Sequence, residues 1–349
     1  MLVTSGQIGK LFDADSGKCY ASDLSELPEF DFSDEKWNQS VISLMTVGKG
    51  VYGFTCGKSN ILGSRYQYVL YVNKTLLNSI LGDGAVDQLY DLQASGEWTW
   101  DKLTEILTRC KAESKSAIGS QVYGLAAMGH DLFRAAMISD GHSFIGQDAD
   151  GKLVSNLADP ELIADLNWAY GLFADGLLNS GKKEKLLYGG ELQLFTENKT
   201  AMLLTSISMI YTIQNSMPDT DLAMVCFPKG PKVTDYTLCS DQSIYIIPNC
   251  EATAAKLNDI AFAYDTYSDP YPEDVAPAET KREYSVLKSA CDPRAYEETW
   301  SILSEKAVYM SNKESLIDFN LQTFCMMPAT SRMLPKKSWR STSRKFRNW

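Results

Sequence analysis

Short apolar runs alternate with stretches of helical periodicity along most of the chain, and this alternation constrains the fold more than any other feature. The runs are rich in β-branched and aromatic residues, which is typical of buried strands. The stretches between them repeat apolar residues every three to four positions, which is typical of amphipathic helices. This order predicts α/β units built around mixed sheets. We expect strands at 66–73, 122–128, 200–206, 221–228 and 242–248, and helices at 99–110, 159–178, 251–268 and 293–305.

Two tryptophans stand at the start of the helix expected at 99–110, in the segment SGEWTWDKLTEIL. Trp100 shares a helix face with the apolar residues that follow, so we expect it to be buried against the sheet. Thr99 is expected to cap the helix, and Asp101 in the first turn favours the helix dipole. Trp98 is expected to pack back on the helix from just outside the cap. Both tryptophans are therefore predicted to support the fold rather than to stack on a ligand. Packing roles are also expected for tryptophans in other helical patterns, namely Trp37, Trp168 and Trp300.

Composition narrows the classes of protein that the chain can belong to. Its 349 residues suggest about two domains, and 44% hydrophobic residues suffice for a core. A net charge of −11 argues against nucleic acid or an anionic membrane as the main partner. No apolar run reaches the roughly 18 residues that would span a bilayer.

Few residues are arranged for metal binding or catalysis. The eight cysteines include no Cys-x-x-Cys pair, and the two histidines lie twelve positions apart, so neither a metal site nor a cofactor is predicted. The cysteines are expected to be buried free thiols. No nucleophile elbow, Walker A loop or dinucleotide fingerprint is present. Because 44 acidic residues offer many chance pairs, a carboxylate pair for glycoside hydrolysis stays open as an alternative.

An ordered series of modest motifs carries the strongest functional signal. The series begins with ILGSRYQYVLYVNKTLL and SGEWTWDKLTEIL, continues through VYGLAAM and GHDLF, and ends with LFTENKTAMLLTS and DLAMVCFPKGPK. In their order and spacing these segments resemble the extracellular solute-binding proteins of ABC importers, family 1, which are similar to maltose-binding protein. The resemblance covers about residues 1–320. One departure is Val72, where the family usually has Tyr before Asn-Lys.

The resemblance implies a two-lobe α/β fold, like that of periplasmic binding proteins, with a hinge that the chain crosses several times. The first lobe would comprise 1–70 and 240–290 and would be incomplete, and the second would comprise 71–239 and 291–349. A sugar or oligosaccharide would bind in the cleft between the lobes and pass to the permease subunits in the membrane, without catalysis. Members of the family act as monomers. They are either anchored by a lipid at the outer face of the cell membrane or located in the periplasm. Alternatives are a glycoside-acting enzyme with a two-lobe cleft and a non-functional fragment of a binding protein.

Ligand-binding residues follow from matching positions in the family pattern. Each has a structural alternative: the loop after the first strand can be an ordinary helix cap, and Tyr66 can be a packed strand aromatic rather than a stacking face. At the end of the strand 200–206 the family often has a stacking aromatic, whereas this chain has serines, which indicates a smaller or more polar ligand. The candidates are Ser5, Gln7, Arg65, Tyr66, Gln67, His130, Asp131, Ser206, Ser208 and Asp241.

Both ends of the chain differ from the family pattern. The segment MLVTSGQ matches an internal point of that pattern, so we expect a chain truncated at its N-terminus. The last 19 residues hold seven basic residues and no acidic one. The genetic code permits a one-frame shift of this stretch into an acidic, family-like ending, so a frameshift after about residue 320 is expected. A solvated tail and a basic arm for anionic surfaces remain the alternatives.

Overall fold

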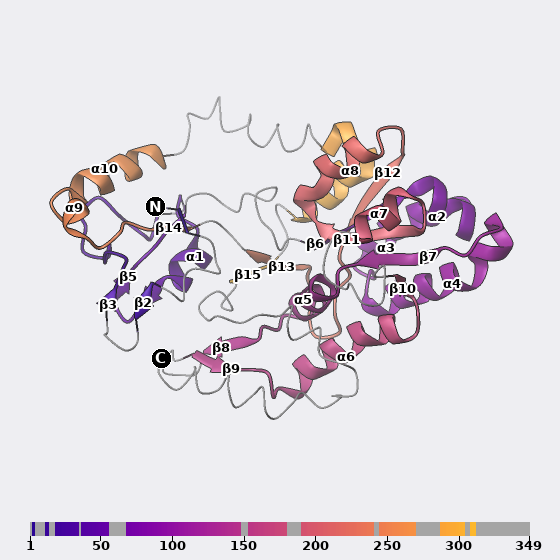
Figure 1. Cartoon of the computed structure of the whole chain (residues 1–349), viewed down its shortest axis with the longest axis horizontal. Helices are drawn as coiled ribbons and strands as arrows, with labels where there is room; N and C mark the ends of the chain where they lie inside the picture. The colour runs from indigo at the N-terminus through magenta and orange to yellow at the C-terminus, as the bar shows by residue number, and fades with distance from the viewer. Residues whose placement is uncertain are drawn as a thin grey trace.

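The helices and strands form two groups, with two short strands lying between them (Figure 1). Residues 11–55 and 244–264 supply the apolar clusters of the smaller group, whereas residues 68–238 and 287–303 supply the single cluster of the larger group. The computed structural model describes residues 2–3, 11–13, 18–34, 36–55, 68–147, 153–179, 190–240, 244–269, 287–303 and 308–311.

The smaller group is built from short strands and an aromatic cluster. Phe54 lies edge-on to Trp37 and to Tyr264, with ring centroids 5.4 Å apart in both pairs. Because Tyr264 is far along the chain from Phe54, this cluster fastens the returning chain to the first 55 residues. The elements of this group are β1 (Leu2–Val3), β2 (Phe12–Asp13), β3 (Lys18–Cys19), α1 (Gln39–Leu44), β4 (Thr46–Val47), β5 (Gly50–Val51), β14 (Ile244–Tyr245), α9 (Glu251–Ala254) and α10 (Leu257–Tyr267).

The larger group is organised around a five-stranded sheet. Its strands, in spatial order, are β10 (Leu178–Asn179), β7 (Tyr123–Ala127), β11 (Thr200–Ser206), β6 (Tyr68–Asn73) and β12 (Leu222–Cys226). Strand β6 runs opposite to the other four strands, so its first residue lies at the edge where those strands end. All six residues of β6 are buried, as expected for a central strand.

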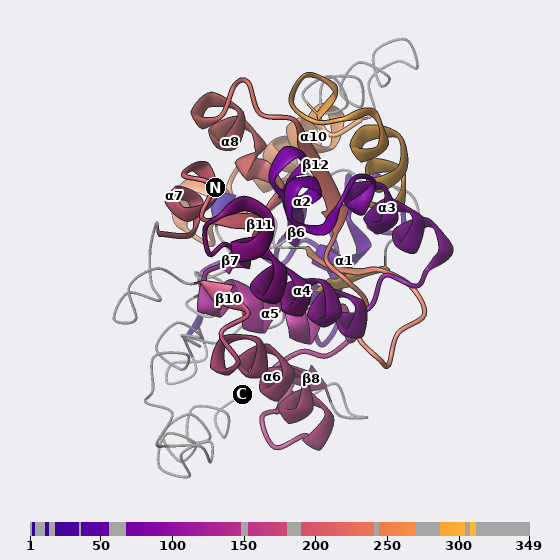
Figure 2. The same cartoon turned by 90° about the vertical axis from the view of Figure 1, so that its right-hand side faces the viewer.

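Helices surround this sheet. Seen end-on, α2, α3 and α4 lie nearest to the viewer, with β6, β7 and β11 behind them (Figure 2). The remaining elements of the larger group are α2 (Lys74–Leu81), α3 (Ala85–Ser95), α4 (Trp100–Ile118), α5 (Gly129–Ser139), β8 (Ile145–Gln147), β9 (Leu153–Ser155), α6 (Pro160–Ala174), α7 (Gly190–Thr196), the 3₁₀ turn η3 (Ile207–Met209), α8 (Ile210–Ser216) and the π-helical turn η4 (Ala295–Thr299).

Local sequence explains where several of these helices begin and end. Asn73 caps α2 by accepting a hydrogen bond from the backbone N–H of Leu76 at 3.0 Å. Asp159 does the same for α6 towards Glu161, and Pro160 takes the first helical position. Gly119 ends α4 with φ 75°, a left-handed conformation that glycine adopts without steric cost.

The outer edge of β12 is covered by side chains rather than by another strand. The backbone N–H of Met224 donates to Tyr90 Oη, and that of Cys226 donates to Gln93 Oε1. Trp98 Nε1 donates to the Cys226 carbonyl at 2.8 Å, and a threonine hydroxyl from η4 caps the Met224 carbonyl. Because unpaired backbone groups at a buried edge are costly, these bonds stabilise the end of the sheet.

Tyr90 also fastens the segment 287–303 to the sheet. Its hydroxyl donates to Asp292 Oδ1 at 2.7 Å, and Lys74 Nζ lies 2.9 Å from the other oxygen of the same carboxylate.

We expect Tyr90→Phe to lower the free energy of unfolding by about 1–2 kcal/mol, because two buried hydrogen bonds disappear. Urea unfolding measures this loss. Tyr211→Phe, at a tyrosine that is 43% exposed, is the control and should stay within about 0.5 kcal/mol; equal losses in both variants would contradict the role given to Tyr90.

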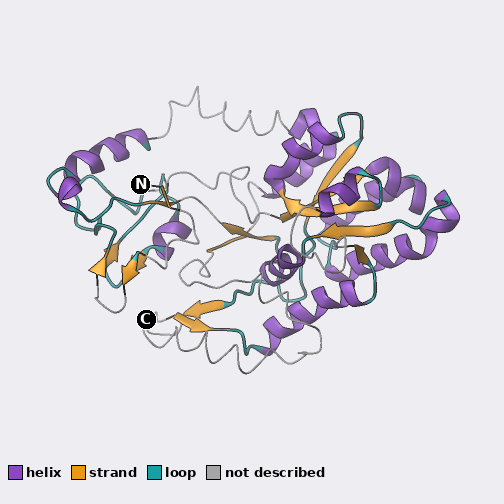
Figure 3. Ribbon diagram, in the orientation of Figure 1, coloured by secondary structure: helices purple, strands orange, loops and turns teal. Residues whose placement is uncertain are grey.

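Strands β13 (Thr237–Ser240) and β15 (Val308–Ser311) pair in parallel between the two groups (Figure 3). The chain leaves the smaller group after residue 55, enters the larger group at Tyr68, and is back in the smaller group at Ile244, directly after β13 and three further residues. It enters the larger group again by Leu287, whose side chain belongs to the core of that group. The two groups are therefore joined by several chain passages.

Most of the elements expected from the sequence are present. The strands β6, β7, β11 and β12 and the helices α4 and α6 form within two or three residues of the expected starts, and the fold is mixed α/β as predicted. Trp98 and Trp100 are buried in the core of the larger group. Among the described residues, no helix combines the length and the apolar character needed to cross a membrane.

Some local expectations are wrong. Thr99 occupies the cap position of α4, but its side chain makes no capping hydrogen bond. Trp37 is buried as expected, yet it precedes α1 instead of lying in a helix. The five cysteines whose side chains the structure describes are free, but Cys250 is exposed because it stands at the cap position of the short surface helix α9.

Candidate functional site

The sheet edge that faces the connecting strands brings together chain segments far apart in sequence. Tyr68, the first residue of β6, is paired in register with Ser206, the last residue of β11. Strand β7 ends nearby and leads directly into α5, while β12 ends at Cys226 and is followed by Phe227. Ends of parallel strands are where binding residues concentrate in α/β proteins, because loops there escape the sheet.

Asp131, in the first turn of α5, is the buried acidic group at this edge. Tyr68 Oη donates a hydrogen bond to Asp131 Oδ1 at 2.8 Å, and His130 Nε2 lies 3.4 Å from the same oxygen. Burial raises the pKa of Asp131, while the charges of His130 and Arg134 and the hydrogen bond from Tyr68 act in the opposite direction and are smaller. The carboxylate of Asp131 therefore lies in contact with both an imidazole and a phenol hydroxyl.

His130 has unused hydrogen-bonding capacity. Its Nδ1 atom is buried and has no hydrogen-bond partner among the described residues. A buried polar atom without a partner costs free energy, so such atoms in native proteins call for an explanation such as a ligand or a water molecule.

Ser206 and Ser208 stand next to Tyr68 at the end of β11. Their hydroxyl oxygens are 3.0 Å apart, and both residues are partly exposed. The hydroxyl of Tyr71 donates to the backbone carbonyl of Ile207 at 2.7 Å, which holds the turn between the two serines against the sheet. The turn therefore presents two hydroxyl groups beside the aromatic ring that begins β6.

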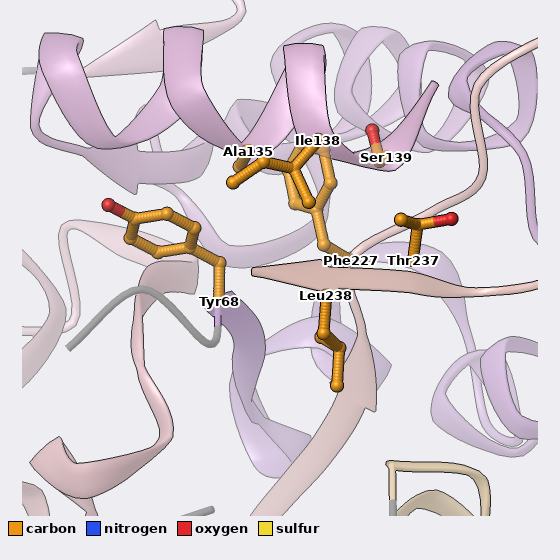
Figure 4. A pocket seen from close by; sticks show the side chains of 7 residues that line it. All are labelled: Tyr68, Ala135, Ile138, Ser139, Phe227, Thr237 and Leu238. Atoms are coloured by element: carbon orange, nitrogen blue, oxygen red, sulfur yellow. The ribbon is translucent and has the colours of Figure 1, made fainter. Parts of the chain in front are cut away.

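A small hollow lies between α5, the sheet edge and β13 (Figure 4). In this view the rings of Tyr68 and Phe227 lie below α5, and Thr237 and Leu238 project from β13. Its cavity volume of about 10 Å³ is close to what one water molecule needs, so this hollow alone is only part of a site. The lining residues are Tyr68, Ala135, Ile138, Ser139, Phe227, Thr237 and Leu238.

The far end of α5 carries a second cluster of charged groups. Asp140, His142 and Asp165 each offer one oxygen or nitrogen atom within 4.8 Å of the others. However, His142 Nδ1 is 2.6 Å from Asp165 Oδ2, whereas two atoms bound to one tetrahedral zinc ion would be roughly 3.3 Å apart. The contact is a hydrogen bond, and the geometry assigns no metal to these residues.

Comparison with known proteins extends this description. The sequence matches no protein-family model and no curated protein. Three solved structures are similar over 99% of this chain, each at 14% sequence identity. They are the GacH receptor of Streptomyces glaucescens, solved unliganded and with acarbose (TM-score 0.57, 82% of that chain covered); the ABC substrate-binding protein Lmo0181 of Listeria monocytogenes with cycloalternan (0.58, 83%); and maltose-bound MalE3 of T. maritima (0.55, 83%).

The chain has the two-lobe fold of these binding proteins. In this binding-protein fold the two groups of elements are the two lobes, and β13 and β15 lie between them. The candidate site is therefore on the second lobe, at the side from which the chain passes to the first.

The structure places four of the predicted site residues at this edge. Asp131 is in contact with both His130 and Tyr68, and Ser206, which is paired in register with Tyr68, is in contact with Ser208. The structure brings these two pairs to one sheet edge of the binding-protein fold, and their part in ligand binding stays a prediction. The other six predicted residues lie outside the described residues: Ser5, Gln7, Arg65, Tyr66, Gln67 and Asp241.

Two residues at this edge were missed in the sequence. Tyr68 belongs to the same run as Tyr66, and in an extended strand residues two apart point to the same face, so the run itself carried a signal for it. Phe227 follows β12 directly, and its position after a strand end was the only signal for it.

Proposed function

We propose that this chain is the solute-binding component of an ABC importer and that it binds a sugar or oligosaccharide between its two lobes. The fold carries the proposal, because three binding proteins solved with acarbose, cycloalternan and maltose are similar over 99% of the chain. The neighbours are binding proteins rather than enzymes, and in the proposed role no bond of the ligand is broken. The bound sugar passes to permease subunits at the membrane.

The proposed ligand contacts combine an aromatic face with hydrogen-bonding groups, the combination that sugars require. Tyr66 would offer the face, while Tyr68, which is only 4% exposed, holds Asp131 in place, and Asp131 and His130 offer a charged acceptor and an imidazole. The hydroxyls of Ser206 and Ser208 extend the polar rim. We propose that the predicted residues outside the described part complete the site, namely Ser5, Gln7, Arg65, Tyr66, Gln67 and Asp241.

Closure of the lobes is the proposed binding motion. The first lobe would contain the smaller group, residues 11–55 and 244–264, and the second the larger group, residues 68–238 and 287–303, with the hinge at the chain passages before β6 and around β13. A hinge of a few passages lets rigid lobes close over a ligand. We propose that the protein acts as a monomer at the outer face of the cell membrane or in the periplasm, as such a transport role demands.

A panel of sugars tests the proposal. Isothermal titration calorimetry of the full chain with maltose, longer maltooligosaccharides, acarbose and cycloalternan should give saturable binding for at least one ligand. Chromatography of the recovered sugar should show it unchanged, because the proposed protein has no catalytic role. Turnover of the sugar would favour a glycoside-acting enzyme, and absence of binding across the panel with intact folding would contradict a sugar-binding role.

A further inference from the structure

We propose that Asp140, His142 and Asp165 form a proton-dependent clamp that holds the C-terminal end of α5 against α6 and the loop after β12. This inference concerns the stability of the second lobe and does not rest on the proposed sugar binding. It starts from three groups that lie outside the candidate ligand site. At 1.5 Å per helical residue, Asp140 is about 15 Å along α5 from His130.

The contacts of the clamp connect three parts of the chain. His142 Nδ1 is hydrogen-bonded to Asp165 Oδ2 in α6 at 2.6 Å and lies 3.8 Å from Asp140 Oδ2 at the end of α5. Asp140 Oδ1 accepts a hydrogen bond from the backbone N–H of Lys232 at 2.5 Å. The side chains of Asp140 and Asp165 are each only 2% exposed. The clamp therefore joins α5, α6 and the 229–232 loop through buried polar contacts.

The loop after β12 is fitted closely to this cluster. A Cβ atom added at Gly230 would come within 2.6 Å of three side-chain atoms of Asp140, so only glycine fits there. The backbone N–H of Gly230 also donates to the Ser139 carbonyl at 2.9 Å. Since Ala135, Ile138 and Ser139 line the hollow at the candidate site, the clamp also fixes one wall of that hollow.

Without a bound proton, the residues of the clamp carry more negative than positive charge. Acidic groups face His142 from α5 and from α6, and the cationic neighbour Lys232 is exposed and paired with Glu161 at 2.6 Å. Two carboxylates buried side by side repel each other, and a shared proton removes that repulsion. The titratable and charged groups around the cluster are Asp140, Asp159, Glu161, Asp165, His142 and Lys232.

Both titrating partners are shifted in the same direction. Burial raises the pKa of Asp165, the hydrogen bond and charge of His142 act against it, and the adjacent Asp140 raises it further, to about 7. Burial lowers the pKa of His142, but the hydrogen bond to Asp165 and the charges of Asp165, Asp140 and Asp159 outweigh it and raise the pKa. The folded chain therefore binds more protons here than the unfolded chain does. Because the unfolded Asp pKa is near 3.8, stability falls as pH rises from about 4 to beyond 7.

Thermal unfolding of the full chain at pH 6.0 and pH 8.5, with EDTA present, tests the clamp. We expect the Tm of the unmodified chain to fall by roughly 3–6 °C more than that of Asp165→Asn over this interval. The amide of the variant keeps the size of the carboxylate, stays neutral and carries its own hydrogens, so no proton is lost there. Asp101→Asn, at an exposed aspartate in α4, is the matched control and should keep the full fall. Equal falls in the unmodified chain and Asp165→Asn would overturn the proposal.

Histidine NMR provides a second readout that does not depend on comparing stabilities. The chain has two histidines, so His130→Gln leaves one imidazole signal and assigns it to His142. In this background the His142 signal should titrate above its ordinary midpoint, and adding Asp165→Asn should move the midpoint towards lower pH. An unchanged midpoint would overturn the clamp even if Asp165→Asn lowers stability for other reasons.

Discussion

Trp98→Ala is expected to lower the free energy of unfolding by about 3–5 kcal/mol, the largest stability effect that we predict for a single residue of this chain. Trp98 is fully buried and is one of the largest fully buried side chains of the core. Its removal leaves a cavity between α3, α4 and β12, and it also removes the donor that caps the Cys226 carbonyl at the edge of the sheet. Urea unfolding, followed by circular dichroism, measures the loss.

Two further variants separate the cavity from the hydrogen bond. Trp98→Phe keeps much of the ring volume but leaves the Cys226 carbonyl without its donor, so a smaller loss of about 1–3 kcal/mol is expected. Trp168→Phe is the control, because Trp168 stacks on Trp100 at 4.1 Å but is only half-buried, and its loss should stay below about 2 kcal/mol. A loss under about 1 kcal/mol for Trp98→Ala would show that Trp98 does not support the sheet edge.

The sequence predicts the larger lobe well because its elements are long enough to show a period. Residues 200–206 read as a strand and form β11 with the same bounds, and the helix expected from residue 99 forms as α4. Burial of Trp100 also follows from the helix periodicity, and burial of Trp98 follows from the packing expected just outside the helix cap. The hydrogen bond from Trp98 to β12 does not, because the two residues that it joins are 128 positions apart.

The smaller lobe could not be predicted in the same detail. Its strands are two residues long, and two residues show no alternation. Of the strand expected at 242–248, residues 242 and 243 lie outside the described residues, Ile244–Tyr245 form β14, and residues 246–248 continue without forming a strand. The helix expected at 251–268 is interrupted at residues 255 and 256, which are alanine and lysine, both good helix formers that give no sign of a break.

The site was predictable as a set of strand ends but not as a set of contacts. The order of motifs led to His130, Asp131, Ser206 and Ser208, all of which lie at one edge of the sheet. The pairing of Tyr68 with Asp131 depends on how β6 and α5 meet in space, and 63 positions separate the two residues. The clamp at the other end of α5 was missed for the same reason, since His142 and Asp165 are 23 positions apart and belong to no local motif.

Asp131→Ala is expected to weaken the affinity for the sugar identified by calorimetry by about 10–100-fold, which corresponds to about 1.4–2.8 kcal/mol. In the proposed site its carboxylate accepts hydrogen bonds from sugar hydroxyls as well as from Tyr68, and hydrogen bonds to a charged group are the stronger kind. The substitution also frees the Tyr68 hydroxyl from its partner at 2.8 Å, so the ring that begins β6 loses its fixed orientation. Calorimetry with the same ligand before and after the substitution measures the change.

Folding has to be separated from binding in this test, because Asp131 is buried. Asp131→Asn keeps the shape of the side chain and one acceptor oxygen, so its affinity for the sugar should fall less than that of Asp131→Ala. If Asp131 had a purely structural role, both variants would have a lower Tm, but the affinity of the folded fraction would not change. Tyr68→Phe keeps the ring and removes only the hydroxyl, and it should weaken binding by roughly tenfold or less. Asp101→Asn, at an exposed aspartate in α4, should bind as the unmodified chain does. If Asp131→Ala and Tyr68→Phe both bind with unchanged affinity, the ligand does not contact this edge, and the proposed placement of the site is wrong even where the sugar itself binds.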